Sequence, residues 1–429
     1  MSSGGASGGS TSGGQASGGA SSGGASNGGS NSGGSTGSTT GGSASGGRAS
    51  GGATSGGNSS GGSSSGGSNS GGAASGGRAS GGAASGGAAS GGAASGGAAS
   101  GGAASGGSGG GSCLTPPAPS ALVGWASLNG GTTGGGNATP TVVTTLEAFK
   151  TAVSGTNAAV VYLNAKLAPA SVAIGSNKTI VGVCGAEFHG HLGFSRSANV
   201  IVRNLKIVGY GVGDCSKDPA YDSAVGCSSG ADAVSVSTAS HNIWFDHCDI
   251  SDGTDGNLDI NAGADFITIS WTKFHYTART DNSGNDSTGA SGHRFSNLIG
   301  SGDDVAEDVG HLNVTWHHNW WAENVNQRMP RTRRGKIHLF NNLFTSTGNS
   351  YCTNAGHEAQ LLVESNIYSG VNNPLSPDAD GSMLERNNLF QNTTGTKVGN
   401  GAGFTPTYSY TPEATGSLAA AIQSGAGPH

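Results

Sequence analysis

The chain has 429 residues, of which 84 are glycine, 33% are hydrophobic and 10% are charged, and its formal net charge is −6 with neutral histidines. This balance argues against a nucleic-acid-binding protein that uses a broad basic surface. No apolar run approaches membrane-spanning length, so we expect no transmembrane segment.

The chain divides into two unlike parts. Residues 1–112 contain only Gly, Ser, Ala, Thr, Asn, one Gln, one Met and two Arg. They offer nothing to bury, and ordering glycine carries the largest entropy cost, so we expect a disordered, low-complexity linker that acts as a tether. Residues 113–429 are long enough for one domain with a core of its own.

All six cysteines fall in the domain, and their even number is compatible with disulfides formed in an oxidising compartment. Cys215 and Cys227 flank a polar loop and are the easiest pair to join, while the remaining connectivity stays open. The start, MSSGGASGG, has neither the basic nor the apolar region of a signal peptide. Secretion is therefore an inference, through an upstream start or by a route that the sequence does not show.

Residues Thr144–Val153 predict a helix. A Thr cap, Glu147 three residues after Thr144, and an apolar face with Leu146 and Phe149 are typical of an amphipathic helix. Such a helix suits a lid over the N-terminal end of the strand repeat that follows it. A second helical pattern, LAAAIQ, lies near the C-terminus.

Short apolar runs recur through the rest of the domain, several of them at intervals of about 23 residues. Such a period predicts an all-β solenoid, a parallel β-helix whose stacked coils bury a narrow core of Ile, Val, Leu and Phe. The runs are NVIVRNLKI (199–207), NIWFDHCDI (242–250), DFITISWTKF (265–274), LNVTWHHNWW (312–321), KIHLFNNLF (336–344), QLLVESNIY (360–368) and SMLERNNLF (382–390).

An Asn occupies the same place in four of these runs, just before the last apolar residues. We expect a ladder of amides that hydrogen-bond along the axis, placed at a bend whose αL backbone Asn tolerates. The four residues are Asn319, Asn342, Asn366 and Asn388.

Several motifs in consistent order resemble the pectate lyase superfamily, polysaccharide lyase family 1, over Gly124 to about Pro428. The resemblance implies a right-handed parallel β-helix, and a secreted, monomeric, calcium-dependent pectate lyase that cleaves (1→4)-α-D-galacturonan in pectin by β-elimination. The motifs are GWASLNGGTTGG (from 124), WFDH (244–247), DGNLDI (255–260), ITISW (from 267), VTWHHNWW (from 314) and QRMPRTRRG (327–335).

Three carboxylates are candidate metal ligands. Asp255 and Asp259 lie four residues apart, and Asp232 falls about one coil earlier, so a solenoid would bring together the hard oxygen ligands that Ca²⁺ prefers. The resemblance implies that these three Asp residues bind catalytic calcium. The family often has a further acidic residue where this chain has Gly230, so that ligand is missing here or is replaced by water or substrate.

The resemblance also assigns the arginines of RMPRTRR. Arg328 matches the residue that abstracts the C5 proton and Arg333 the one that binds the substrate carboxylate, which leaves Arg331 and Arg334 without a role. Calcium and cationic side chains would stabilise the enolate-like transition state. A guanidinium is protonated at ordinary pH, so an alkaline optimum is expected.

A third cationic residue, usually Lys in calcium-dependent members, aligns with either Arg279 or Arg294, because a polar insertion separates them. Arg at this place also occurs in pectin lyases, so a pectin lyase acting on methylated pectin stays an alternative. We expect Asp246, His247, His317 and His318 to be structural.

Two further alternatives remain. A polygalacturonase would need clustered acid and base carboxylates, and the adjacent Asp303 and Asp304 fall in an apparent loop. A non-catalytic pectin-binding β-helix would not require Arg328 together with the three Asp residues.

Overall fold

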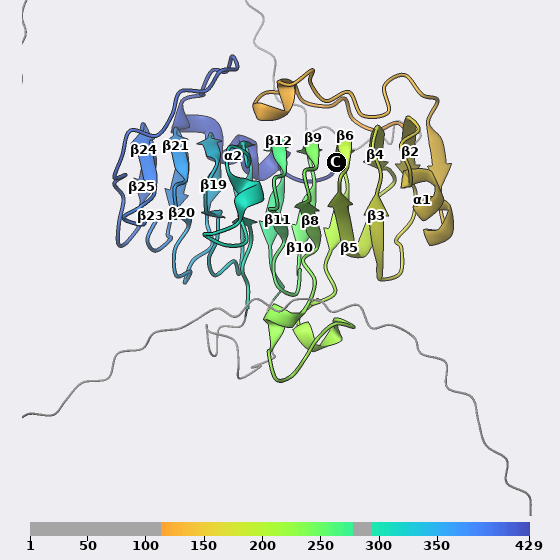
Figure 1. The fold of residues 1–429 in the computed structure, drawn as a ribbon, viewed down its shortest axis with the longest axis horizontal. Coiled ribbons are helices and arrows are strands. Elements are labelled where there is room, and N and C mark those ends of the chain that lie inside the picture. The colour runs from red at the N-terminus through yellow and green to blue at the C-terminus, as the bar shows by residue number, and fades with distance from the viewer. Residues whose placement is uncertain (1–112, 278–292) are drawn as a thin grey trace, which may run out of the picture. The chain divides into compact units, whose positions relative to one another are not determined.

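The structure, a computed structural model, describes residues 113–277 and 293–429. In these residues short parallel strands repeat in coils, and each coil passes from a sheet A strand to a sheet B strand and then to a sheet C strand (Figure 1). The predicted all-β parallel β-helix is therefore confirmed. The expected linker, residues 1–112, lies outside the described residues.

Sheet A has ten strands, and sheets B and C are joined through the long strand β5 (Glu187–Ser195) into a 15-stranded sheet. Sheet A contains β1 (Thr141–Val143), β2 (Ala159–Leu163), β4 (Lys178–Gly182), β6 (Ala198–Arg203), β9 (His241–Asp246), β12 (Asp265–Ser270), β15 (Val314–His317), β18 (Lys336–Phe340), β21 (Gln360–Glu364) and β24 (Ser382–Arg386). Sheet B contains β7 (Lys206–Val208), β10 (Asp249–Ser251), β13 (Lys273–His275), β16 (Trp320–Trp321), β19 (Leu343–Phe344), β22 (Ile367–Ser369) and β25 (Leu389–Gln391). Sheet C contains β3 (Ala170–Ile174), β8 (Val234–Ser237), β11 (Leu258–Ile260), β14 (Leu298–Ile299), β17 (Arg331–Thr332), β20 (Thr353–Ala355) and β23 (Leu375–Pro377).

The core is a set of columns that run along the axis, because in-register parallel strands place equivalent residues over one another. One fully buried column in sheet A contains Val161, Ile180, Val202, Phe245, Ile269, Trp316, Leu339 and Val363. In sheet B the column is aromatic, with ring centroids 4.3–5.6 Å apart, and contains Phe274, Trp321, Phe344 and Tyr368. The sequence prediction of an Ile, Val, Leu and Phe core missed this use of Trp and Tyr.

The predicted Asn ladder is confirmed at the turn from sheet A to sheet B. The Nδ2 of Asn319 donates to Oδ1 of Asn342 at 3.0 Å, and the same contact links Asn342 to Asn366 at 2.9 Å and Asn366 to Asn388 at 3.0 Å. The expectation that these Asn adopt αL was wrong. The residue before each one has positive φ, for example Asn341 at 53°, so the bend precedes the ladder.

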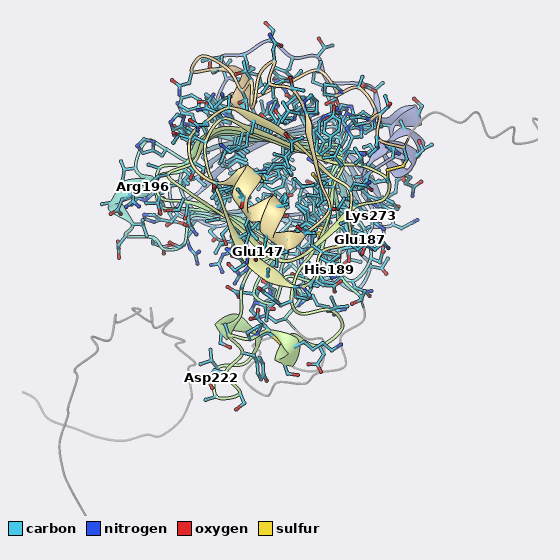
Figure 2. The ribbon with its side chains drawn as sticks, turned by 90° about the vertical axis from the view of Figure 1, so that its right-hand side faces the viewer. Glu147, Glu187, His189, Arg196, Asp222 and Lys273 are labelled. Carbon is cyan, nitrogen blue, oxygen red and sulfur yellow. A yellow bond between two sulfur atoms is a disulfide. The ribbon has the colours of Figure 1, made fainter. Side chains whose placement is uncertain are left out.

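Two α-helices cover parts of the solenoid. Helix α1 (Leu146–Val153) closes the N-terminal end as predicted, with Phe149 fully buried against Phe188 (Figure 2). Its N-cap is Thr145, whose hydroxyl accepts from Ala148 N, so the prediction that Thr144 caps it was wrong by one residue. Helix α2 (Thr415–Gly425) packs Leu418 and Ile422 on Leu343 and Ile367 of sheet B.

Two disulfides join Cys113 to Cys184 and, as predicted, Cys215 to Cys227. Cys248 and Cys352 are buried thiols. The second disulfide lies in the segment between β7 and β8, which projects from the coils and carries Asp222 (Figures 1 and 2). Short 3-10 turns complete the described structure at Trp125–Ser127, Cys215–Lys217, Cys227–Ser229 and Ala306–Asp308. Within residues 113–277 and 293–429, no helix is long and apolar enough to cross a membrane.

Candidate active site

The candidate site lies on the outer face of sheet C. There the in-register side chains change from coil to coil, in contrast to the uniform Asn ladder. The line of residues along the axis is Ser235, Asp259, Leu298, Arg331 and Asn354. Asp232 lies just before this line and Arg328 just before Arg331, so acidic and basic groups from successive coils meet.

Asp232 and Asp259 border one small space. A Cβ atom added to Gly256 would lie 2.9 Å from Oδ1 of Asp232 and 3.0 Å from Oδ1 of Asp259. The glycine therefore leaves open the gap between two carboxylates. Oδ1 of Asp232 is buried and receives no hydrogen bond from the described residues. Its other oxygen accepts from Ser235 Oγ at 2.9 Å.

The surroundings of this pair disfavour the charged form of both carboxyl groups. Burial and the charge of Asp255 together raise the pKa of Asp259 to about 7, although Arg328 acts in the opposite direction. Burial also raises the pKa of Asp232 well above its ordinary value, and the charges of Asp259 and Asp255 add to the effect. A cation between the two carboxylates would favour their ionised forms.

Asp255, the third predicted ligand, is oriented differently. Its Oδ1 lies 2.8 Å from Nε2 of His293, a side chain that is only 3% exposed and lies directly after the undescribed segment 278–292. In the part of the chain that the structure describes, no three His, Cys, Asp or Glu side chains form a metal-binding group. The fold places Asp255 near Asp232 and Asp259, but its carboxylate would have to turn away from His293 to bind the same ion.

Arg328 lies against the acidic group. It acts electrostatically on both Asp232 and Asp259, and its guanidinium carbon lies 4.2 Å from the ring centroid of Phe295 on the neighbouring coil. The Nε atom is buried and has no acceptor among the described residues. Stacking on the ring fixes the guanidinium plane without using its donors, so they remain available to a bound molecule.

Arg333 and Arg331 complete the basic side of the site. Nε of Arg333 lies 3.1 Å from Oδ1 of Asp303, and burial lowers the pKa of Arg333, as do the positive charges of Arg331 and Arg328. Tyr351 is half-buried beside them: burial raises its pKa, and all three guanidiniums oppose that rise. Sequence reasoning missed Tyr351, because the only signal would have been its position one coil after the arginines.

The four clustered arginines separate in space. Arg334 does not join the site: it pairs with Glu358 and donates to the main-chain oxygen of Asp303. Arg294 lies on the coil before Arg328, where its main-chain oxygen accepts from Asn326 N at 2.8 Å. Arg279, the other candidate for the third cation, lies outside the described residues.

The missing acidic residue at Gly230 has a steric explanation. A Cβ atom there would come within 2.1 Å of the Thr254 side chain and 2.8 Å of Oδ2 of Asp218. That Asp218 oxygen accepts from Ala231 N at 2.8 Å, so a carboxylate from the disulfide loop lies where a side chain at 230 would begin. The sequence could not reveal that Asp218 lies beside Gly230, because only the folding of the disulfide loop brings these two residues together.

The polar residues expected to be structural lie at the turn from sheet A to sheet B. Asp246 is fully buried and accepts from Ser270 Oγ at 2.8 Å and from Ser120 Oγ at 2.6 Å. His317 and His318 contact each other through their Nδ1 atoms at 3.0 Å. These contacts hold the N-terminal segment and the turn, on a different sheet from the candidate site.

The site thus joins carboxylates and arginines on one sheet of a parallel β-helix, and comparison with known proteins identifies the class of enzyme. The family model described as pectate lyase matches residues 113–428. Pectate lyase A of Aspergillus niger is 34% identical over 319 residues, which cover 72% of this chain and 87% of that protein. The chain therefore belongs to the pectate lyase family and is a polysaccharide lyase.

Other relatives and solved structures agree. Probable pectate lyase B of Aspergillus terreus is 35% identical over 266 residues, which cover 59% of this chain and 70% of that protein. The crystal structure of a pectate lyase from Bacillus sp. N165, determined in complex with trigalacturonate, matches with a TM-score of 0.57 at 22% identity, covering 72% of this chain and 99% of that one. At that identity the likeness shows the fold.

Proposed function

We propose that this enzyme cleaves unesterified (1→4)-α-D-galacturonan by calcium-dependent β-elimination at the site formed by Asp232, Asp255, Asp259, Arg328 and Arg333. The observation that carries the proposal is the open space between Asp232 and Asp259, next to an arginine whose buried Nε has no acceptor among the described residues. The trigalacturonate bound to the Bacillus relative supports an acidic sugar as substrate.

The residues at this space fit calcium. Two carboxylate oxygens face the gap left by Gly256, one of them without a hydrogen bond from the described residues, and hard oxygen ligands are those that calcium takes. Asp232 and Asp259 would hold the ion, and Asp255 would join them by leaving His293. Bound calcium supplies positive charge that neutralises the substrate carboxylate and acidifies the adjacent C5–H bond.

The arginines would act on the sugar itself. Arg328 would remove the C5 proton, the electron pair of the C5–H bond forms the C4=C5 double bond, and the C4–O bond breaks. The leaving oxygen takes up a proton from water. Arg333 binds the C6 carboxylate and stabilises the negative charge that develops on it. Arg331 adds positive charge to the same side of the site. Arg294 or Arg279 would supply the third cation.

We also propose that the enzyme acts as a monomer outside the cell, on a tether formed by residues 1–112. Two disulfides and fungal pectate lyase relatives are consistent with secretion.

The test is the ultraviolet absorbance of the unsaturated product on polygalacturonate and on fully methylated pectin, with calcium or with EDTA. We expect product only from polygalacturonate with calcium. Product from methylated pectin in EDTA would assign the enzyme to the pectin lyases, and absence of product under all four conditions would exclude both activities.

A further inference from the structure

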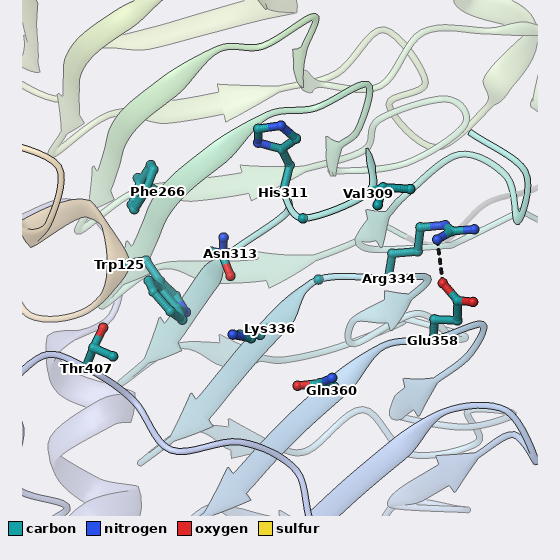
Figure 3. Close-up of a pocket in the computed structure, with 12 residues that line it drawn as sticks. Trp125, Phe266, Val309, His311, Asn313, Arg334, Lys336, Glu358, Gln360 and Thr407 are labelled. Atoms are coloured by element: carbon teal, nitrogen blue, oxygen red, sulfur yellow. Dashed lines mark hydrogen bonds and ion pairs between the residues drawn. The ribbon is translucent and has the colours of Figure 1, made fainter. Parts of the chain in front are cut away.

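A cavity of about 410 Å³ lies apart from the candidate active site, where the turns from sheet C to sheet A meet the N-terminal segment (Figure 3). Its volume falls in the range of about 300–1,000 Å³ that small-ligand sites occupy. Trp125 and Phe266 form its apolar wall, and its polar lining includes His311, Arg334 and Lys336.

The wall is rigid. The ring of Trp125 stacks on Phe404 at 5.9 Å and meets Tyr408 edge-on at 5.5 Å, while its main-chain N donates to Thr315 Oγ1 at 3.0 Å. Phe266 meets the same ring edge-on at 6.4 Å. These contacts fix the position of the indole ring and hence the direction of its N–H.

The donors in this cavity lack acceptors. Only 6% of the surface of Trp125 is exposed, and its Nε1 has no acceptor among the described residues. Figure 3 shows the nitrogen end of the indole turned toward Lys336. Lys336 is exposed and forms no ion pair with any described residue, and both residues line the cavity. Because Nε1 itself is covered, the side chains around it would have to move aside for a ligand oxygen to reach it.

The charge balance favours an anionic occupant. Arg334 pairs with Glu358, so these two lining charges cancel. Asp265 lies outside the cavity lining, where its Oδ1 accepts from Asn313 N and Nδ2 at 2.9 and 2.8 Å and its Oδ2 lies 3.4 Å from Nδ1 of His311. The ammonium of Lys336 is then left without a counter-ion among the described lining residues, next to an indole N–H that also needs an acceptor. One carboxylate would satisfy both.

We propose that this cavity binds a uronate unit of a galacturonan chain outside the active site, with the uronate carboxylate held by Lys336 and the indole N–H of Trp125. The identity of the polymer rests on the proposed function. Arg333 and Arg334 are consecutive and belong to the active site and the cavity respectively, so the two sites lie on either side of one turn. Such a site would hold the enzyme on polymeric substrate without taking part in cleavage.

The test compares Lys336→Gln and Trp125→Phe with Lys397→Gln, which removes another exposed ammonium elsewhere, in the full chain. Polygalacturonate in a native gel with EDTA measures binding without turnover, and a neutral galactan gel tests the need for carboxylates. We expect the apparent Kd for polygalacturonate to rise about tenfold in the two cavity variants and to stay unchanged in the control. Turnover of trigalacturonate with calcium should equal wild type in all three.

Three outcomes would overturn the proposal: equal retardation of the cavity variants and the control, a parallel loss of trigalacturonate turnover, or equal retardation of the wild type by neutral galactan. The phenylalanine variant keeps the stacked ring, so a loss of binding there reports the N–H rather than a collapsed wall. If the wild type produces no unsaturated product, the proposed function fails, while the binding comparison still decides whether the cavity recognises a uronate.

Discussion

The turn between sheets A and B and the outer face of sheet C both carry lines of stacked residues, but the two lines are built in opposite ways. At the turn four successive coils contribute Asn, and the amides of Asn319, Asn342 and Asn366 bond to one another. On sheet C successive coils contribute Asp259, Leu298 and Arg331, which do not repeat. The repeated Asn residues satisfy each other's hydrogen bonds and so stabilise the fold. The residues that differ from coil to coil on sheet C instead bring charges of both signs together at the candidate active site.

The largest effect is expected for Arg328→Lys, which tests whether the non-repeating line on sheet C serves activity and not stability. Because Nε of Arg328 has no partner among the described residues, the change should leave the unfolding temperature unaltered and lower kcat on polygalacturonate about 10³-fold. Arg196→Lys, at an exposed position with similar positive φ, is the matched control and should keep full activity. A variant that retains half of wild-type kcat would remove Arg328 from the reaction.

The opposite change is Asn342→Ala in the middle of the ladder. It removes the acceptor of Asn319 and the donors to Asn366 and Trp316 O, and it leaves buried polar groups unpaired. We expect a loss of about 3 kcal/mol in the free energy of unfolding, with kcat per folded molecule unchanged. Asn388→Ala at the half-buried end of the ladder should cost less. Equal losses at both positions would show that the ladder does not act through burial.

Asp259→Asn tests whether the acidic pair opposes folding in the absence of metal. The pKa of this carboxyl is raised to about 7 in the folded state, so without calcium wild-type stability falls as the pH rises from about 4 to 7. The Asn variant should therefore be more stable than wild type by about 2 kcal/mol at pH 8 in EDTA, and inactive with calcium. Denaturant unfolding at pH 5 and pH 8 measures the difference, and an Asn variant that is less stable at pH 8 would contradict it.

The smallest effect is expected at Glu364 on sheet A. Burial alone would raise its pKa, but hydrogen bonds from His338 and Arg386 outweigh it and lower the pKa to about 2. Its contribution is complete above the unfolded pKa of about 4.3 and is lost as the pH falls to 2. Glu364→Gln should cost about 1–2 kcal/mol at pH 7 and nothing near pH 2. A cost that does not change with pH would mean that the charge is unimportant.

The sequence was sufficient to predict those parts of the fold that follow a repeating or closely spaced pattern. The coils, the ladder, helix α1 and the Cys215–Cys227 disulfide each follow from spacing within about one coil, and the resemblance supplied the candidate site residues, of which Asp232 and Asp259 border one space. Features formed by contacts between loops and coils were not predictable. Asp218 beside Gly230 and His293 beside Asp255 depend on how loops fold back on the sheet, and spacing carries no record of that.

Helix α1 prevents the β-helix from adding further strands at its N-terminal end. A stack of parallel coils has no inherent last member, because the end of each sheet offers unpaired backbone groups and an open apolar core to any further strand. At the N-terminal end helix α1 covers that core with Phe149 and Val153, which are both fully buried. The helix thus ends the stack of coils at a defined point. We expect a chain without it to assemble end to end into fibres.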